Sequence, residues 1–154
     1  MNPKTLESKW QKKWAEAKAY ESEPGGAKEK YFVNCPYPYM NGYLHLGHAF
    51  TYLRADMVSR YQRMQDKNVL FPFAFHCTGT PIVAAAQRVE EGEETQIKAL
   101  KQMGLSDTLI KKFSNPEEWT KHFPDKAIQD LKKFGASIDW LSLIHISEPT
   151  RLRR

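Results

Sequence analysis

The chain is poor in cysteine and has no long apolar run. Only two cysteines occur among its 154 residues, Cys35 and Cys77, and both stand in apolar surroundings. We therefore expect no disulfide framework, and a reducing compartment such as the cytoplasm is favoured. No apolar stretch approaches the roughly 20 residues that a helix needs to cross a bilayer, and the first residues lack the apolar core of a signal peptide. These absences exclude a disulfide-rich secreted domain and predict no membrane-spanning segment.

What the chain does contain is ordinary for a globular domain. Its hydrophobic and charged fractions are 41% and 27%, and its length suggests about one domain. The net charge of +5 comes from lysines that are spread along the chain, mostly on expected helix surfaces. Solvated helix faces explain these lysines. Binding of a polyanion such as RNA is compatible with the charge but is not indicated by it.

The hydrophobic pattern predicts alternating helices and strands. We expect an amphipathic helix over 3–21, a strand over 30–35, a helix over 46–65 and a buried parallel strand over 69–75. Further helices are expected over 82–91, 95–103, 106–113, 116–122 and 125–134. For the helix over 46–65, the pattern predicts a buried apolar face made of Leu46, Ala49, Phe50, Leu53, Met57, Tyr61 and Met64. This order favours an α/β fold, in which ligands bind beyond the carboxyl ends of parallel strands.

The loop after the first expected strand carries the most chemistry. Residues 36–48 have the sequence PYPYMNGYLHLGH, in which a Pro- and Gly-rich turn leads to two histidines at a helix start. His45 and His48 then share one helix face, and the helix N-terminus favours an anion. The arrangement predicts binding of a nucleotide triphosphate, with both imidazoles stabilising charge on the phosphates. A capping turn with solvated imidazoles is the structural alternative. The loop over 76–81 is expected to line the same crevice.

These motifs resemble the class I aminoacyl-tRNA synthetases, which carry a His-x-Gly-His signature in a Rossmann-like fold. Here the signature is His45-Leu46-Gly47-His48. The fuller match, over 30–48, 71–82 and 134–140, is similar to leucyl enzymes of the eukaryotic-cytosolic and archaeal type. The resemblance implies the N-terminal half of a Rossmann-like catalytic domain, with parallel strands and crossover helices, preceded by an amphipathic helix.

The same resemblance suggests how the chain is divided. Residues 1–29 would form the N-terminal helix and a linker, and residues 30–140 a partial catalytic domain. Residues 141–151 match the in-frame translation of a transposase sequencing adaptor, so we expect a non-native tail over 141–154. A genuine short strand over 141–146 is the alternative.

The resemblance also implies an activity and a set of site residues. In the family, leucine and ATP form leucyl-adenylate with loss of pyrophosphate, and the acyl group then passes to tRNA(Leu). His45 and His48 would be catalytic, acting on the ATP phosphates. The implied ATP-binding residues are Pro38, Asn41, His45, Gly47 and His48. The implied leucine-binding residues are Asn34, Cys35, Tyr37 and His76. Gly47 would let the adenine ring approach the backbone. Mg²⁺ would accompany ATP, with no carboxylate assigned to it and no resident metal.

A second signature of the family, a Lys-Met-Ser-Lys-Ser-type loop, does not occur in this sequence. We therefore expect the activity of a longer parent protein, and we expect the chain alone not to charge tRNA. Membership of a multi-synthetase assembly is not indicated either way. The alternatives are a small His-x-Gly-His nucleotidyltransferase and a non-catalytic nucleotide- or RNA-binding module. A zinc site drawn from the histidines and the two cysteines matches no familiar ligand spacing.

Overall fold

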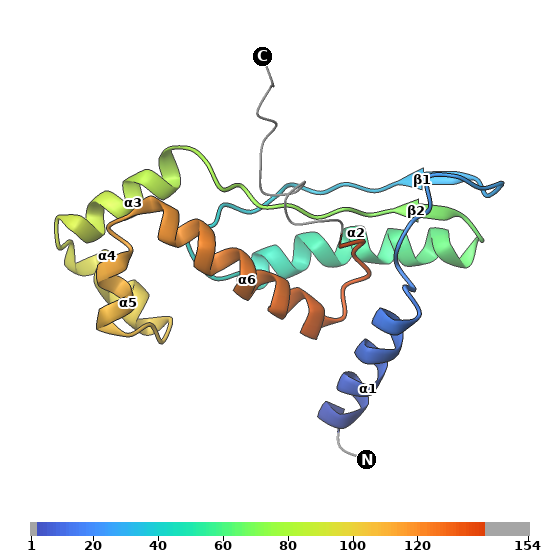
Figure 1. The fold of residues 1–154 in the computed structure, drawn as a ribbon, viewed down its shortest axis with the longest axis horizontal. Coiled ribbons are helices and arrows are strands. Elements are labelled where there is room, and N and C mark those ends of the chain that lie inside the picture. Colours follow the sequence, from blue (N-terminus) through green and yellow to red (C-terminus); the bar gives the residue numbers. More distant parts are fainter. Residues whose placement is uncertain (1–2, 141–154) are drawn as a thin grey trace. The chain divides into compact units, whose positions relative to one another are not determined.

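The computed structural model describes residues 3–140, which contain six helices and two strands (Figure 1). Their order is α1 (Pro3–Glu16), β1 (Lys30–Phe32), α2 (Leu46–Met64), β2 (Asn68–Leu70), α3 (Thr80–Glu90), α4 (Glu94–Gln102), α5 (Asp107–Lys112) and α6 (Pro116–Phe134). The described residues fall into two compact units: 3–37, 45–74 and 129–140 in the first, and 38–44 and 75–128 in the second. The expected non-native tail, 141–154, lies outside the described residues.

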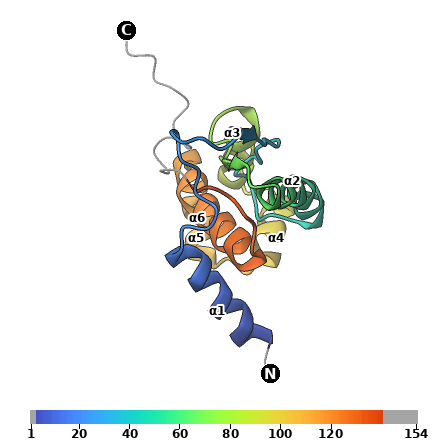
Figure 2. The same cartoon turned by 90° about the vertical axis from the view of Figure 1, so that its right-hand side faces the viewer.

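The first unit is built on parallel strands with α2 beside them. Strand β1 pairs with β2 so that Tyr31 stands opposite Val69. Farther along, Pro72 forms a parallel bridge with Asp139, whose N–H donates to the carbonyl of Phe71 at 2.9 Å. Helix α2 connects the two strands and runs alongside them, as Figure 1 shows from the side and Figure 2 along the helix axis. This arrangement confirms the expected α/β class.

Both strands are shorter than the sequence predicts. Regular pairing ends at Phe32 in β1 and at Leu70 in β2. Alternating burial nevertheless continues after β2, because Phe71, Phe73 and Phe75 are all buried. Pro72 has no N–H to give to a ladder. The predicted strand over 69–75 therefore has the expected burial pattern but only part of the expected hydrogen bonding.

Helix α2 has the predicted extent, but the face that it buries is the opposite one. Its buried residues are Tyr52, Asp56 and Ser59. Ala49 is half-buried. The other expected core residues are exposed by between 41% and 88%: Leu46, Phe50, Leu53, Met57, Tyr61 and Met64. The helical period was therefore predicted correctly, whereas the prediction of which side faces the core was wrong.

The polar face of α2 is buried because it satisfies the backbone that follows α6. The Asp56 carboxylate accepts a hydrogen bond from the N–H of Ser137 at 2.5 Å and pairs with Arg60 at 2.7 Å. Arg60 in turn donates to the carbonyl of Gly135 at 2.5 Å. Arg63 donates to the Ser137 hydroxyl at 2.8 Å. Buried backbone without partners is costly, so polar side chains face this irregular segment.

Helix α1 ends at Glu16, before the predicted end at residue 21, and none of its residues is buried. Gln11 donates from its side chain to the carbonyl of Lys133 at 2.8 Å. After the helix, Ser22 donates its N–H and its hydroxyl to the Asp139 carboxylate, both at 2.9 Å. Hydrogen bonds and the half-buried ring of Trp14, which lies 5.7 Å from the Arg60 guanidinium, therefore connect this segment to the rest of the first unit.

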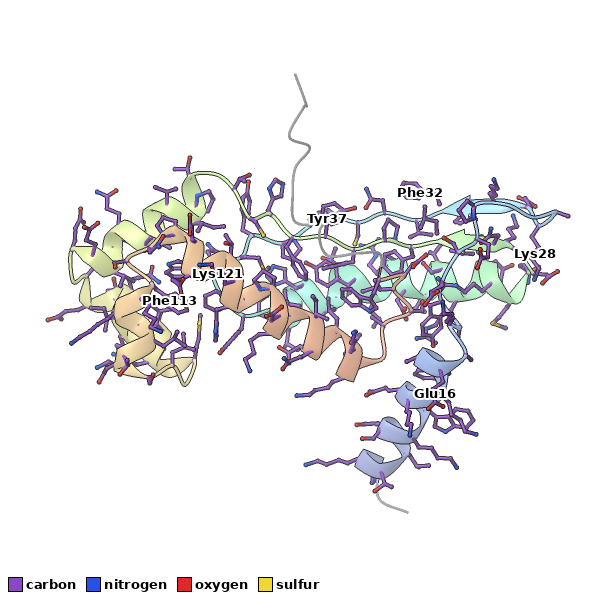
Figure 3. The ribbon with its side chains drawn as sticks, viewed as in Figure 1. Glu16, Lys28, Phe32, Tyr37, Phe113 and Lys121 are labelled. Carbon is purple, nitrogen blue, oxygen red and sulfur yellow. The ribbon has the colours of Figure 1, made fainter. Side chains whose placement is uncertain are left out.

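The second unit is helical and has an aromatic core. Phe113, Trp119 and Phe123 lie within 5.5 Å of one another by ring centroid (Figure 3 labels Phe113). The indole N–H of Trp119 donates to the carbonyl of Phe113 at 2.6 Å. Helix α6 continues through Pro124, where the sequence predicts two helices. The residues buried along α6 at intervals of four are Trp119, Phe123, Ala127 and Leu131. One continuous buried face thus outweighs the hydrogen bond that proline removes.

Two local features of the second unit concern a helix start and a histidine. Helix α3 has Gly79 as its N-cap, with no side-chain cap hydrogen bond and with φ at +99°, a conformation that glycine adopts without strain. The ring of His122 packs against Tyr43 and Phe113, with centroids 6.3 Å and 5.6 Å away. Burial lowers the pKa of His122.

Candidate functional site

The two signature histidines begin α2, and each one caps the helix. His45 is the N-cap residue, and its Nδ1 accepts a hydrogen bond from the N–H of Gly47 at 3.0 Å. In return, Nδ1 of His48 accepts from the N–H of His45 at 3.2 Å. The ring centroids lie 4.0 Å apart. The helix start is therefore a reciprocal capping box made of two imidazoles.

This capping determines which nitrogen of each ring carries the proton. A neutral imidazole whose Nδ1 accepts a hydrogen bond must carry its hydrogen on Nε2. His45 and His48 then present two Nε2–H donors from neighbouring rings, and such donors suit phosphate oxygens. The N–H of Gly47 is already bonded to His45. That amide is thus not free for an anion, whereas the two imidazoles offer their Nε2–H groups.

His48 is held in its neutral form. Burial lowers its pKa below the ordinary value of 6.5, and a positive charge on the adjacent His45 lowers it further. His48 is half-buried, whereas His45 is exposed. His48 is therefore suited to donate a hydrogen bond as a neutral imidazole.

Gly47 is required by the geometry of the histidine pair itself. A Cβ at this position would lie 2.9 Å from Cε1 and 3.0 Å from Nδ1 of the His45 ring. Any side chain would displace that ring and break the cap. The close approach of an adenine ring to Gly47 stays a prediction.

The predicted residues Asn34, Cys35 and Tyr37 follow β1 in the same unit. The side-chain oxygen of Asn34 accepts from the N–H of Cys35 at 2.9 Å. Cys35 is buried, and burial raises the pKa of its thiol to about 11. This thiol is neutral and is no nucleophile at physiological pH. Tyr37 packs edge-on against Phe73, with ring centroids 6.1 Å apart.

A groove of about 460 Å³ runs beside this segment. It is lined by residues 31–36 and by Thr51, Arg54, Ala55 and Val58 of α2. Asn34 and Cys35 therefore share one concave surface, and Tyr37 does not line it. The volume is in the range that small-molecule sites have in proteins.

The other predicted residues, Pro38, Asn41 and His76, belong to the second unit. The N–H of His76 donates to the carbonyl of Pro38 at 2.8 Å, and the N–H of Met40 donates to the carbonyl of His76 at 3.1 Å. The exposed ring of His76 stacks on Tyr39 with centroids 4.7 Å apart. The structure thus pairs the loop after β1 with the loop after β2 at this point. A common crevice lined by both loops stays a prediction.

One residue of this region escaped the sequence analysis. Tyr52 lies one helical turn after His48, and the two rings are nearly parallel, 17° apart in plane and 5.9 Å by centroid. Tyr52 is only 3% exposed. The signal that could have revealed it is the spacing of four residues from His48 on one helix face.

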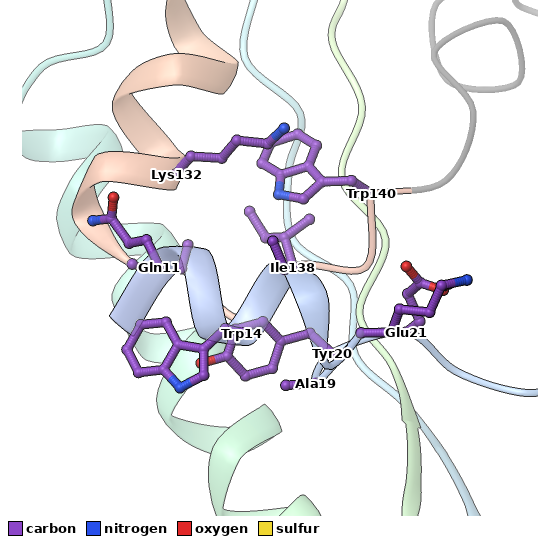
Figure 4. Close-up of a pocket in the computed structure, with 12 residues that line it drawn as sticks. Gln11, Trp14, Ala19, Tyr20, Glu21, Lys132, Ile138 and Trp140 are labelled. Carbon is purple, nitrogen blue, oxygen red and sulfur yellow. The ribbon is translucent and has the colours of Figure 1, made fainter. Parts of the chain in front are cut away.

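A second concave region of the first unit does not belong to the site. This cavity of about 370 Å³ is lined by Trp14, Tyr20, Ile138 and Trp140 among others, and by none of the candidate residues (Figure 4). Over residues 3–140, no group of three or more His, Cys, Asp or Glu side chains could hold a metal ion, so the zinc alternative gains no support there. Within the same range no helix is long and apolar enough to span a membrane.

Sequence comparison identifies the family. The chain matches the profile of the tRNA synthetases class I (I, L, M and V) over residues 9–144. The chain belongs to the class I tRNA synthetases. The leucine–tRNA ligase of Aeropyrum pernix is 47% identical to this synthetase chain over 137 residues, which are 89% of the chain and 14% of that protein. The leucine–tRNA ligase of Nanoarchaeum equitans is 48% identical over 112 residues, covering 73% of the chain and 11% of that protein.

A solved structure shows the same fold. The LeuRS of Agrobacterium radiobacter K84, in a ternary LeuRS–tRNA–LeuAMS complex, matches this class I synthetase chain with a TM-score of 0.66 at 23% identity. The match covers 87% of the chain and 14% of that LeuRS. The chain therefore spans only between about a ninth and a seventh of the length of these relatives.

Proposed function

We propose that this chain supplies the start of the catalytic domain of a leucine–tRNA ligase. The observation that carries the proposal is the pair of neighbouring imidazoles, His45 and His48, whose Nδ1 atoms accept backbone hydrogen bonds at the start of α2 and leave each Nε2–H as the donor. The family profile spans four amino-acid specificities, and the names of the relatives at 47% and 48% identity support leucine among them. The second substrate is then tRNA(Leu).

In the proposed first step, a carboxylate oxygen of leucine attacks the α-phosphorus of ATP. The bond between that phosphorus and the bridging oxygen breaks, and pyrophosphate leaves with the electron pair. Negative charge grows on the phosphate oxygens, where the Nε2–H groups of His45 and His48 donate hydrogen bonds. In the second step, the terminal hydroxyl of tRNA(Leu) attacks the acyl carbon, and AMP and a proton are released.

The other candidate residues bind the substrates in this proposal. Asn34, Cys35 and Tyr37 border the leucine, with His76 near its amino group. Cys35 is supported in this role because a buried neutral thiol on a groove suits an apolar side chain. Pro38, Asn41 and Gly47 contact ATP together with the two histidines. Mg²⁺ enters with ATP, since this ion is commonly held by substrate phosphates. No residue of the chain is assigned to it.

The fold supports a Rossmann-like nucleotide site. Strand β1, helix α2 and strand β2 form a parallel unit, and the bridge between Pro72 and Asp139 begins a third parallel connection. The site is placed after the carboxyl end of β1, where open α/β sheets bind ligands. The thiols of Cys35 and Cys77 are free, which fits a proposed location in the cytoplasm.

The exposed face of α2 argues against a small, self-sufficient nucleotidyltransferase. Leu46, Phe50 and Met57 on this face are 88%, 65% and 63% exposed. Contiguous apolar surface of this kind is typical of an interface and not of a free monomer. We therefore place the chain within a longer synthetase, whose further parts would complete the reaction.

A chimeric enzyme tests the proposal directly. The 137 matched residues of the Aeropyrum pernix leucine–tRNA ligase would be replaced by those of this chain, and amino-acid-dependent exchange of pyrophosphate into ATP would be measured. We expect exchange with leucine and charging of tRNA(Leu), but no exchange with isoleucine, methionine or valine. Exchange driven by one of those three amino acids would overturn the leucine specificity. A folded chimera without any exchange would overturn the proposed catalytic role of the segment.

A further inference from the structure

Tyr52 is a buried residue in ring contact with the signature histidine His48, and no role yet explains it. Its ring lies flat against that of His48, at a centroid distance of 5.9 Å and an interplanar angle of 17°. Tyr52 is only 3% exposed, whereas His48, its stacking partner, is half-buried. Offset stacking at this distance is a favourable aromatic geometry.

Tyr52 is itself held in place from its other side. Its ring meets Phe73 edge-to-face at 4.8 Å and 86°, and Phe73 is fully buried. Phe73 also contacts Tyr37, one of the proposed leucine-binding residues, at 6.1 Å. Rotating the Tyr52 ring would disturb this packing, so its orientation is fixed by the strand side of the first unit.

The phenol brings no charge to the histidines. Burial raises the pKa of Tyr52, and the nearby thiol of Cys35 would raise it further if it were ionised. Because Tyr52 stays neutral, its effect on His48 is through packing and ring orientation.

We propose that Tyr52 is a positioning residue that fixes the imidazole of His48, and through it the aim of both Nε2–H donors. The His48 ring is held at Nδ1 by the N–H of His45 at 3.2 Å and on its face by Tyr52. The exposed His45 ring lies against His48 at 4.0 Å. Tyr52 thus connects the histidine pair to Phe73 and Tyr37 beside the proposed leucine site. The catalytic consequence rests on the proposed function, whereas the positioning itself does not.

Proton NMR of the 154-residue chain tests the positioning without any activity. At a pH of about 8, where imidazoles are neutral, we expect nuclear Overhauser contacts between the ring protons of Tyr52 and His48. We also expect ring-current shifts of the His48 protons that persist in Tyr52→Phe and disappear in Tyr52→Leu. Tyr61→Leu is the matched control, because Tyr61 is 58% exposed on the opposite face of the same helix. Absence of the contacts in the unaltered chain overturns the proposal, even where a variant fails to fold.

The chimeric enzyme tests the catalytic consequence. Misplacing a catalytic group by about 1 Å can cost about 100-fold, so we expect Tyr52→Leu to lower kcat for pyrophosphate exchange by about 10- to 100-fold. The KM for leucine should change less, and Tyr52→Phe should restore most of the rate. If Tyr52→Leu removed the ring-current shifts of the His48 protons but left kcat unchanged, Tyr52 would still position His48. The proposed catalytic role of His48 would then be overturned. Equal loss in the Phe and Leu variants would overturn positioning by the ring.

Discussion

The two faces of α2 are used in the opposite way from an ordinary surface helix. One face carries His48, Tyr52, Asp56 and Ser59 and is turned toward the first unit. The other face carries the large apolar residues and is exposed. The difference teaches that a helix can pack through polar and aromatic side chains, because these satisfy distant backbone groups and stack on one another. Its apolar face is then left for contacts beyond the described residues.

The largest effect should come from the histidine at the start of the buried face. We expect His48→Ala in the chimeric enzyme to lower leucine-dependent pyrophosphate exchange by about 10²–10³-fold, as for the loss of one donor to a developing oxyanion. Lys12→Ala is the control and should retain the rate, because the Lys12 side chain is 76% exposed on α1 and belongs to neither face of α2. If the exchange rate of His48→Ala stayed within about threefold of the unaltered chimera, the loss would be only about 0.7 kcal/mol of transition-state stabilisation. That result would contradict the proposed contact of His48 with the phosphates.

The next effect concerns the carboxylate in the middle of the buried face. Asp56→Ala leaves the N–H of Ser137 and the guanidinium of Arg60 without their partner. We expect a loss of about 2–3 kcal/mol in the free energy of unfolding, measured by urea denaturation. Glu16→Ala is the matched control, since Glu16 also forms an i,i+4 ion pair, with Lys12 at 3.7 Å, but is exposed. Equal losses in both variants would show that the buried network does not stabilise the fold.

A pH effect follows from the two histidines whose pKa is lowered by burial, His48 and His122. The unfolded chain takes up protons at these positions near pH 6.5, before the folded chain does. Stability is therefore complete above about pH 6.5 and decreases as the pH falls below it. We expect the urea midpoint to drop between about pH 7.5 and pH 5, and to drop less in His48→Gln and in His122→Gln. A midpoint that rises on acidification would contradict the sign.

The smallest effect is expected on the exposed face. Met57 is 63% exposed, so Met57→Gln should change the free energy of unfolding of the chain by no more than about 0.5 kcal/mol. The same change should reduce self-association in sedimentation experiments, because it interrupts the apolar surface. A marked loss of stability would mean that this face is buried in solution. The two faces of α2 would then not differ in burial.

Much of the local structure followed from residue patterns. The start and end of α2 were predicted within one residue, because the loop before His45 and the apolar period are local signals. The parallel pairing of the first two strands was confirmed as well. The continuity of α6 through Pro124 was not predictable in this way, since it depends on one buried face along the whole helix.

The candidate site shows the same division. That His45 and His48 begin a helix on one face was readable from their spacing. That their Nδ1 atoms accept backbone hydrogen bonds, which leaves the proton of each neutral ring on Nε2, only the tertiary structure shows. Tyr52 was hidden because a single aromatic residue on a helix is most simply a packing residue, and only its stack on His48 distinguishes it.

The sequence by itself determined the family signature, the α/β class and the helical period of α2. These depend on the order of residues along the chain. The tertiary structure decided which face of α2 is buried, how the imidazoles are oriented and what lies beneath them. The reason is physical: local periodicity can place side chains on a common face, but the side that turns inward is the one that satisfies distant backbone. Here that backbone is the segment around Ser137, which follows Asp56 by 81 residues along the chain.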